Sequence, residues 1–178
     1  MSRAAYGAID QIGYLVDDLD EAVARWTERT GIGPWTVFRN VRLEGTYRGE
    51  PTIVTMEVAL GYQGDIQIEL IATPGDTPSP YRDPSGQRLI GIHHIAWIVD
   101  DLDSAVVDAK RRGLVPVFTA RNPASNVAYL ESPGEAGILY ELIEGAQMRQ
   151  MISAGIIATK TWDGGNPVTE IDLAVPAA

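Results

Sequence analysis

The feature that most constrains the fold is an internal repeat. Residues 9–23 read IDQIGYLVDDLDEAV and residues 92–106 read IHHIAWIVDDLDSAV, so the two segments align at an offset of 83 without a gap. A second match, residues 68–71 (IELI) against residues 140–143 (YELI), follows at an offset of 72. Two matches in the same order indicate a duplicated module. The difference between the offsets gives the first copy eleven extra residues in its middle.

Each copy has the pattern of a βαβββ unit. Ile9 to Val16 has the alternation and β-branched content of a strand, and Asp18 begins a helix as the first residue of a capping box. Strand-like runs follow each helix, in the first copy at 35–42, 52–60 and 65–73. We therefore predict an α+β fold in which two tandem βαβββ modules pair into one cupped, mixed β-sheet that encloses a metal site. The expected units are a first module (8–73), a linker (74–90), a second module (91–144) and a C-terminal helix and tail (145–178).

Charge and composition exclude several classes of function. The chain has 14 basic and 24 acidic residues, a net charge of −10, which argues against nucleic acid as a partner. It has no cysteine, so thiol chemistry and disulfides are excluded. No signal-like segment and no apolar run of membrane-spanning length is present, so we expect a cytoplasmic protein without a membrane partner.

Strand alternation brings four polar residues to one place. Residues two apart share a face of a strand, so Gln11 and His94 occupy equivalent inward positions in the two copies, and so do Glu69 and Glu141. His93 is expected to point outward. A carboxylate inside a sheet is costly unless it is paired or bound to a cation. One imidazole, two carboxylates and an amide form a nitrogen and oxygen site that suits Zn, Ni, Co, Mn or Mg.

At these residues the sequence resembles the vicinal oxygen chelate superfamily, which contains glyoxalase I, methylmalonyl-CoA epimerase, extradiol dioxygenases and antibiotic resistance proteins. The resemblance covers residues 8–144 and is carried by IHHIAWIVDDLD (92–103) and YELI (140–143). It implies one divalent metal ion held from the first and last strands of each module. Carried over by position, the ligands are Gln11, Glu69, His94 and Glu141.

The resemblance implies that a carboxylate removes a proton next to a carbonyl while the metal stabilises the enolate. Glu141 is the first candidate for the base, and Glu57, expected to face inward beside Glu69, is the candidate for a second base. Glu44 and Glu50 are weaker candidates. The expected activity is an epimerase, racemase or isomerase acting on a small-molecule carbonyl substrate, either an acyl-CoA or an apolar ketone, in a homodimer.

Other functions stay open on the sequence alone. A glyoxalase-type lyase fits the same ligand set, and a non-catalytic drug-binding or metabolite-binding protein fits the same fold. A dioxygenase would need a second histidine ligand. Four aromatic residues either line an apolar substrate pocket or are ordinary strand residues, namely Trp35, Phe38, Tyr47 and Tyr62.

Overall fold

The computed structural model describes residues 4–135 and 137–174. The first module contains β1 (Gln11–Leu15), α1 (Leu19–Thr30), β2 (Trp35–Tyr47), β3 (Glu50–Gln63) and β4 (Ile66–Ala72). The second contains β5 (Gly91–Ile98), α2 (Leu102–Arg111), β6 (Val115–Arg121), β7 (Asn126–Glu131) and β8 (Leu139–Glu144). The helix α3 (Met148–Thr161) and the strand β9 (Val168–Asp172) follow.

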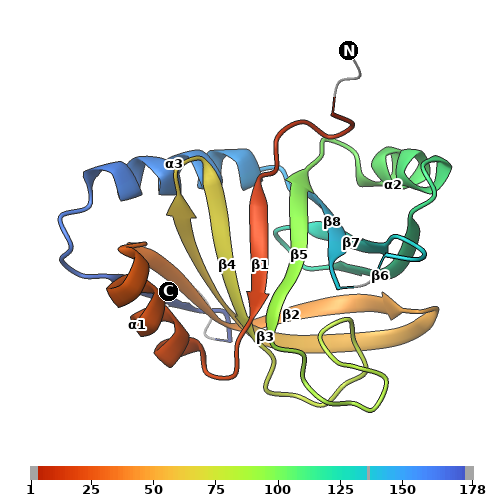
Figure 1. Cartoon of the computed structure of the whole chain (residues 1–178), viewed down its shortest axis with the longest axis horizontal. Coiled ribbons are helices and arrows are strands. Elements are labelled where there is room, and N and C mark those ends of the chain that lie inside the picture. The colour runs from red at the N-terminus through yellow and green to blue at the C-terminus, as the bar shows by residue number, and fades with distance from the viewer. Residues whose placement is uncertain (1–3, 136, 175–178) are drawn as a thin grey trace.

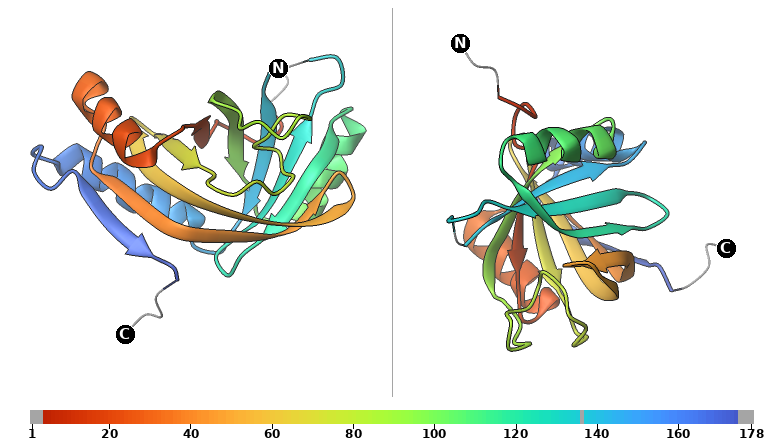
Figure 2. Two further views of the ribbon diagram at one scale, coloured as in Figure 1. Left: turned by 90° about the horizontal axis from the view of Figure 1, so that it is seen from below. Right: turned by 90° about the vertical axis from the view of Figure 1, so that its right-hand side faces the viewer.

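The strands form one sheet that closes on itself. In sheet order they run β3-β4-β1-β5-β8-β7-β6-β2, and β2 pairs back with β3, so eight strands complete a ring. The pairs β1–β4 and β5–β8 are parallel, whereas β1 and β5 join the two modules in antiparallel fashion. Figure 1 shows β4, β1 and β5 side by side, and Figure 2 shows the sheet curled into a cup. The predicted fold class of two paired βαβββ modules in a cupped mixed sheet is confirmed.

Helices α1 and α2 each pack on the outer face of their own module. The side chain of Asp18 accepts a hydrogen bond from the Glu21 N–H at 2.9 Å, and that of Asp101 accepts one from the Ser104 N–H at 2.8 Å. The repeated DDLD run therefore begins each helix as a cap. Beneath each helix lies a separate apolar cluster formed with the outward side chains of the strands.

A third apolar cluster fills the inside of the cup. It draws on strands of both modules and includes Met56, Phe118 and Tyr129. The linker contributes Tyr81, which is 1% exposed, and α3 contributes Ile152. The concave side of the sheet is thus packed with side chains, and α3 runs across the upper end of the central strands in Figure 1.

The β2–β3 hairpin is longer than the sequence pattern indicated. The stretch between residues 42 and 52, expected as loop, continues both strands to a turn at Arg48–Gly49. Its physical support comes from the other module, because residues 44–47 of β2 pair with residues 118–121 of β6. The extra residues of the first copy therefore carry the hairpin across to the second module and close the ring, as the long hairpin in Figure 2 shows.

The segments outside the two modules are also ordered against them. Strand β9 pairs in parallel with residues 35–39 of β2, and the linker contains a bridge between Arg82 and Arg88. Within the described part of the chain, no helix has the length and apolar character needed to cross a membrane.

Candidate metal centre

The four side chains expected as ligands converge inside the cup. They come from four neighbouring strands, Gln11 on β1, Glu69 on β4, His94 on β5 and Glu141 on β8. His94 Nε2 lies 3.2 Å from Gln11 Oε1, 3.2 Å from Glu69 Oε2 and 3.0 Å from Glu141 Oε2. The ligand atoms of Glu69, His94 and Glu141 all lie within 4.8 Å of one another. The four donor atoms therefore lie close enough together to be candidate ligands of one ion.

A glycine makes this convergence possible. Gly13 of β1 is the register partner of both Glu69 on β4 and His94 on β5. A methyl group on Gly13 would overlap the imidazole ring of His94. The absence of a side chain at this one position lets the His94 ring lie over β1 and reach the two carboxylates.

The cluster is almost completely enclosed. His94 is fully buried, Gln11 and Glu141 are each 3% exposed, and the side chain of Glu69 is 15% exposed. Glu141 Oε2 is buried, and apart from His94 Nε2 at 3.0 Å no donor among the described residues contacts it. A buried carboxylate oxygen normally has a donor or a cation beside it. The donor set and this buried oxygen therefore fit a bound divalent ion with nitrogen and oxygen ligands.

Burial and mutual charge perturb the two central groups. Burial raises the pKa of Glu141 to about 7, with the Glu69 carboxylate adding to the rise and the charge of His94 opposing it. For His94, burial by itself lowers the pKa, but the Glu141 and Glu69 carboxylates outweigh it and the net shift is upward. In the metal-free protein, protonation of His94 therefore offsets part of the negative charge of the Glu69 and Glu141 carboxylates.

A chain of amides orients Gln11. Its Nε2 donates to Gln67 Oε1 at 2.7 Å, and Gln67 Nε2 donates in turn to the Tyr62 hydroxyl at 2.7 Å. These bonds occupy the nitrogen end of the Gln11 amide, so its Oε1 faces His94. Gln67 shares the inner face of β4 with Glu69, and its role depends on the β1–β4 register of Gln11 with Gln67, which a strand pattern does not contain.

The expected outward orientation of His93 is wrong. Gly13 pairs with His94 and Tyr14 pairs with Ile92, so a β-bulge skips His93 and breaks the alternation of β5. His93 is 6% exposed, and its ring is stacked on Tyr81 with a centroid separation of 5.1 Å. Burial lowers its pKa to about 3, with the charge of His94 adding to the fall and a hydrogen bond to Pro80 opposing it.

The expected inward orientation of Glu57 is also wrong. Glu57 would lie beside Glu69 only if the β3–β4 turn were centred on Gln63, but the turn is centred on Gly64 and Asp65, so Leu60 lies opposite Glu69. Glu57 is three residues from Leu60, an odd number, and therefore lies on the opposite face. Outside the cup its carboxylate accepts a hydrogen bond from Arg39 at 2.9 Å. It cannot act as a base at the ligand cluster from there.

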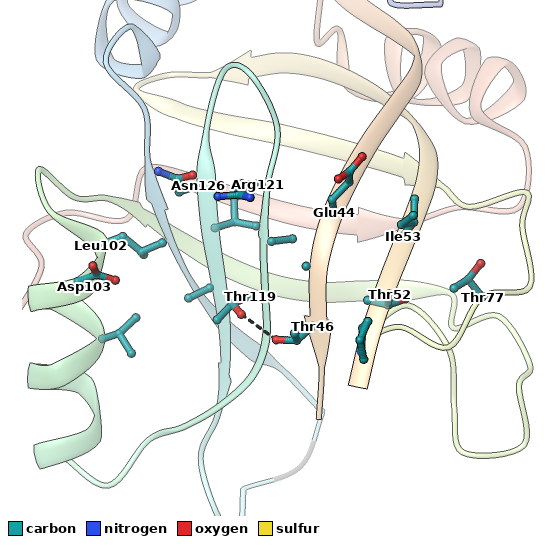
Figure 3. Close-up of a pocket in the computed structure, with 16 residues that line it drawn as sticks. Glu44, Thr46, Thr52, Ile53, Thr77, Leu102, Asp103, Thr119, Arg121 and Asn126 are labelled. Atoms are coloured by element: carbon teal, nitrogen blue, oxygen red, sulfur yellow. Dashed lines mark hydrogen bonds between the residues drawn. The ribbon is translucent and has the colours of Figure 1, made fainter. Parts of the chain in front are cut away.

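The two weaker carboxylate candidates also lie away from the cluster. Glu44 lines a groove of about 860 Å³ outside the cup, between α2 and the β2–β3 hairpin (Figure 3), where it is ion-paired with Arg42 at 2.9 Å. The dashed line in Figure 3 joins Thr46 and Thr119 of the same groove, 3.1 Å apart. Glu50 is exposed beside the β2–β3 turn. None of the four expected ligands lines this groove.

The four aromatic candidates divide between the two faces of the sheet. Trp35 packs outside with α1, whereas Phe38, Tyr47 and Tyr62 belong to the cluster inside the cup. Tyr47 also lines an opening of about 430 Å³ at the linker side of the cup, and His93 forms part of the same opening.

Fold and site together define a class, that of paired βαβββ proteins with a candidate metal centre inside the sheet. The sequence profile of the Glyoxalase/Bleomycin resistance protein/Dioxygenase superfamily matches residues 10–130. The chain belongs to this superfamily, which is the vicinal oxygen chelate superfamily expected from the sequence. Glu141 lies beyond the matched residues, on β8. No curated protein matches the sequence.

Solved structures share the fold at low identity. Methylmalonyl-CoA epimerase from Mycobacterium tuberculosis is 22% identical, with 85% of this chain and 96% of that chain covered and a TM-score of 0.54. A hypothetical protein from Bacillus halodurans is 21% identical, with 77% of this chain and 93% of that chain covered and a TM-score of 0.53. At these identities the likeness establishes the fold.

Proposed function

We propose that the protein is a divalent-metal-dependent isomerase, an epimerase or racemase, that removes a proton next to a carbonyl group. The observation that carries the proposal is the convergence of Gln11, Glu69 and Glu141 on His94 Nε2 at 3.0–3.2 Å in the buried interior of the sheet. The substrate class is a small carbonyl compound, an acyl-CoA thioester or an apolar ketone. The acyl-CoA alternative is supported by the fold shared with methylmalonyl-CoA epimerase.

Gln11, Glu69, His94 and Glu141 would hold the ion from the inner face of the sheet. A divalent cation there would polarise the substrate carbonyl and stabilise the negative charge that develops on its oxygen, by several kcal/mol. Gln11 is neutral and held by Gln67, so it contributes an oxygen without adding charge. The apolar cluster around the ligands excludes water, which strengthens every charge interaction at the site.

Glu141 would accept the proton from the substrate carbon. The donor beside its Oε2 is His94 Nε2, at 3.0 Å, whose proton a bound ion would replace, so the oxygen would then be free to receive a proton. Inversion needs a second group on the other side of the substrate carbon, and with Glu57 outside the cup the remaining carboxylate is Glu69. We assign the return of the proton to Glu69, the most exposed of the four ligands, at 15% of its side chain.

The first test is metal content by elemental mass spectrometry on untagged protein. The expected result is about one metal ion per chain in the wild type and in the control Glu28→Gln, an exposed carboxylate on α1, with loss of the ion in His94→Ala and Glu141→Gln. No ion in the wild type, even after reconstitution with Mn, Co, Ni and Zn, would overturn the metal assignment.

The second test is solvent deuterium exchange into candidate thioesters and ketones. The wild type should exchange the proton next to the carbonyl and interconvert the stereoisomers, and Glu141→Gln should lose exchange. Glu69→Gln should still exchange the proton of one stereoisomer with solvent but should interconvert the two stereoisomers much more slowly. Metal binding without exchange, but with turnover of a hemithioacetal, would replace the isomerase by a lyase. Tight binding of apolar ligands without turnover would indicate a binding protein.

The predicted homodimer stays a prediction. Sedimentation equilibrium measures the oligomeric state directly, since one chain has a mass of 19.3 kDa and a homodimer would have twice that mass.

A further inference from the structure

His93 has no function in the site described above, yet it contacts a ligand directly. Its Nδ1 lies 3.0 Å from His94 Nδ1, on the side of the His94 ring opposite the ligand atom Nε2. Its other nitrogen, Nε2, lies 2.9 Å from the backbone carbonyl oxygen of Pro80 in the linker. A continuous line of polar contacts therefore joins the linker backbone to the proposed metal centre.

The donors and acceptors along this line can be assigned by elimination. The Pro80 carbonyl can only accept, so His93 Nε2 must carry a proton and donate. A neutral imidazole has one proton, which leaves His93 Nδ1 as an acceptor. His94 Nδ1 must then carry a proton and donate to it. His94 Nε2 faces acceptor oxygens of Gln11, Glu69 and Glu141, so in the metal-free protein it carries a second proton. A bound metal ion would take the place of that proton and leave His94 as the Nδ1–H tautomer.

The surroundings of His93 hold it neutral and in place. Its two polar partners are a carbonyl and an imidazole, neither of them anionic, and a buried cation without an anionic partner is costly. Its ring is stacked on Tyr81, and the Tyr81 hydroxyl donates to the Tyr129 hydroxyl at 3.1 Å. Ser79 and Tyr81, on either side of Pro80, are 3% and 1% exposed, so the linker is held in the interior at this contact.

We propose that His93 is a positioning residue that, held by the Pro80 carbonyl, fixes His94 as the Nδ1–H tautomer and presents its Nε2 to the metal ion. The linker is then part of the metal centre through Pro80 and Tyr81. The inference about the metal rests on the proposed function, whereas the proton positions on the two rings do not. Residues that orient a histidine ligand in this way typically change metal affinity 10-fold to 100-fold when replaced.

The proton positions can be read directly by NMR on the metal-free protein. The chain has two histidines in total, so ¹⁵N-histidine labelling gives only two imidazoles to assign. We expect a proton on His94 Nδ1, none on His93 Nδ1, and a coupling between these two nitrogens across the hydrogen bond. This pattern holds whether or not His94 Nε2 also carries a proton. A proton on His93 Nδ1, or none on His94 Nδ1, would overturn the proposal without the use of any variant.

Three variants test the consequence for the metal by calorimetric titration with Zn²⁺ and by the absorption spectrum of bound Co²⁺. His93→Phe keeps a ring against Tyr81 but removes both nitrogens, and should weaken Zn²⁺ binding at least about tenfold and alter the Co²⁺ spectrum. His93→Asn can place an acceptor oxygen near the position of Nδ1 and should restore most of the affinity. Trp97→Phe, on the outer face of the same strand, is the control for general effects on β5.

The outcomes separate this inference from the proposed function. Equal Zn²⁺ affinity in the wild type and in a folded His93→Phe would overturn the positioning role while leaving the metal centre intact. Failure of the wild type to bind any divalent ion would overturn the proposed function, and the NMR pattern would then decide the His93–His94 hydrogen bond by itself.

Discussion

Gly13 shows how one missing side chain can determine a site. It lies between Glu69 and His94 in the sheet register, and the His94 ring occupies the space where a Cβ would stand. We expect Gly13→Ala to displace the imidazole and lower Zn²⁺ affinity at least about tenfold. Overpacking of the interior should also cost roughly 1–3 kcal/mol of the free energy of unfolding.

The matched control is Gly75→Ala in the linker. Gly75 has no atom within 4 Å of the position of a Cβ and does not have a positive φ, so alanine should change neither metal affinity nor stability measurably. Calorimetric Zn²⁺ titration and urea unfolding of both variants provide the comparison. Wild-type affinity in Gly13→Ala would mean that the His94 ring does not need this position.

The buried His93 predicts a specific pH dependence of stability in the metal-free protein. Its pKa is lowered to about 3, against 6.5 for an ordinary histidine, so the unfolded chain binds a proton that the folded chain does not. The contribution of neutral His93 to the free energy of unfolding is therefore fully present above about pH 6.5, and it is lost as the pH falls toward 3. Between about pH 6.5 and about pH 4.5 the loss is roughly 2 kcal/mol.

His93→Asn isolates this contribution, because asparagine does not titrate. His94 and Glu141 titrate in both proteins, so the difference between wild type and variant reports on position 93. Urea unfolding in the presence of a chelator should show a smaller loss of stability in the variant between the two pH values. Equal losses would mean that His93 takes up its proton in the folded state.

Strand alternation predicted the orientation of the four candidate ligands but not of every residue around them. It placed Gln11, Glu69, His94 and Glu141 correctly on the inner face, because a two-residue period is a local property of a strand. It failed for His93, where pairing with β1 forces a bulge. It also failed for residues of β3, Glu57 among them. The β3–β4 turn is centred on Gly64 and Asp65 rather than on Gln63, which shifts the pairing of β3 with β4 by an odd number of residues. Bulges and turn centres depend on pairing between strands, which a single strand pattern does not contain.

At the scale of elements, the sequence revealed the extra residues of the first module but not their use. The segment around Glu44 and Gly45 contains a glycine and charged residues, which weaken any strand signal. It becomes a strand because β6 of the other module supplies a pairing edge, with Gly45 opposite Ala120. A tertiary contact therefore determines local structure where the local preference is weak.

Helix α3 depends on a similar close approach, between Gly155 and the ring of Tyr62. Alanine in a helix interior normally stabilises by about 0.5–1 kcal/mol relative to glycine. Here the added methyl would overlap the Tyr62 ring, so we expect Gly155→Ala to lift α3 from β3 and destabilise by roughly 1–2 kcal/mol. Thermal unfolding should show a fall in Tm of a few degrees.

The exposed face of α3 offers the control. Ser153 is exposed and its hydroxyl donates only to the Arg149 carbonyl oxygen of the same helix, so Ser153→Ala should leave Tm unchanged or raise it slightly. A higher Tm in Gly155→Ala than in the wild type would show that helix propensity outweighs the contact with Tyr62, and that α3 is not closely docked on the barrel.

At the scale of the whole molecule, the duplication explains both the fold and the site. The two modules meet at the antiparallel β1–β5 pair, and each module contributes its first and last strands, β1 with β4 and β5 with β8, to one half of the ligand cluster. Neither module alone can assemble the four side chains. The sequence repeat was therefore sufficient to predict that these four side chains lie together, although closure of the ring by β2 and β6 was not visible in it.

Because each module completes the sheet and the interior cluster of the other, we predict that the two modules unfold together. The ring is closed by β1–β5 on one side and by β2–β6 on the other, and the interior cluster mixes side chains of both modules. Gly45→Val at the β2–β6 contact would place a side chain against the Thr119 carbonyl oxygen and should destabilise by about 2 kcal/mol. Hydrogen exchange measured along a urea titration should show β4 and β7 losing protection at one shared midpoint, which is lower in the variant. Separate midpoints for the two strands would mean that each module is stable by itself and that the closed ring is not one cooperative unit.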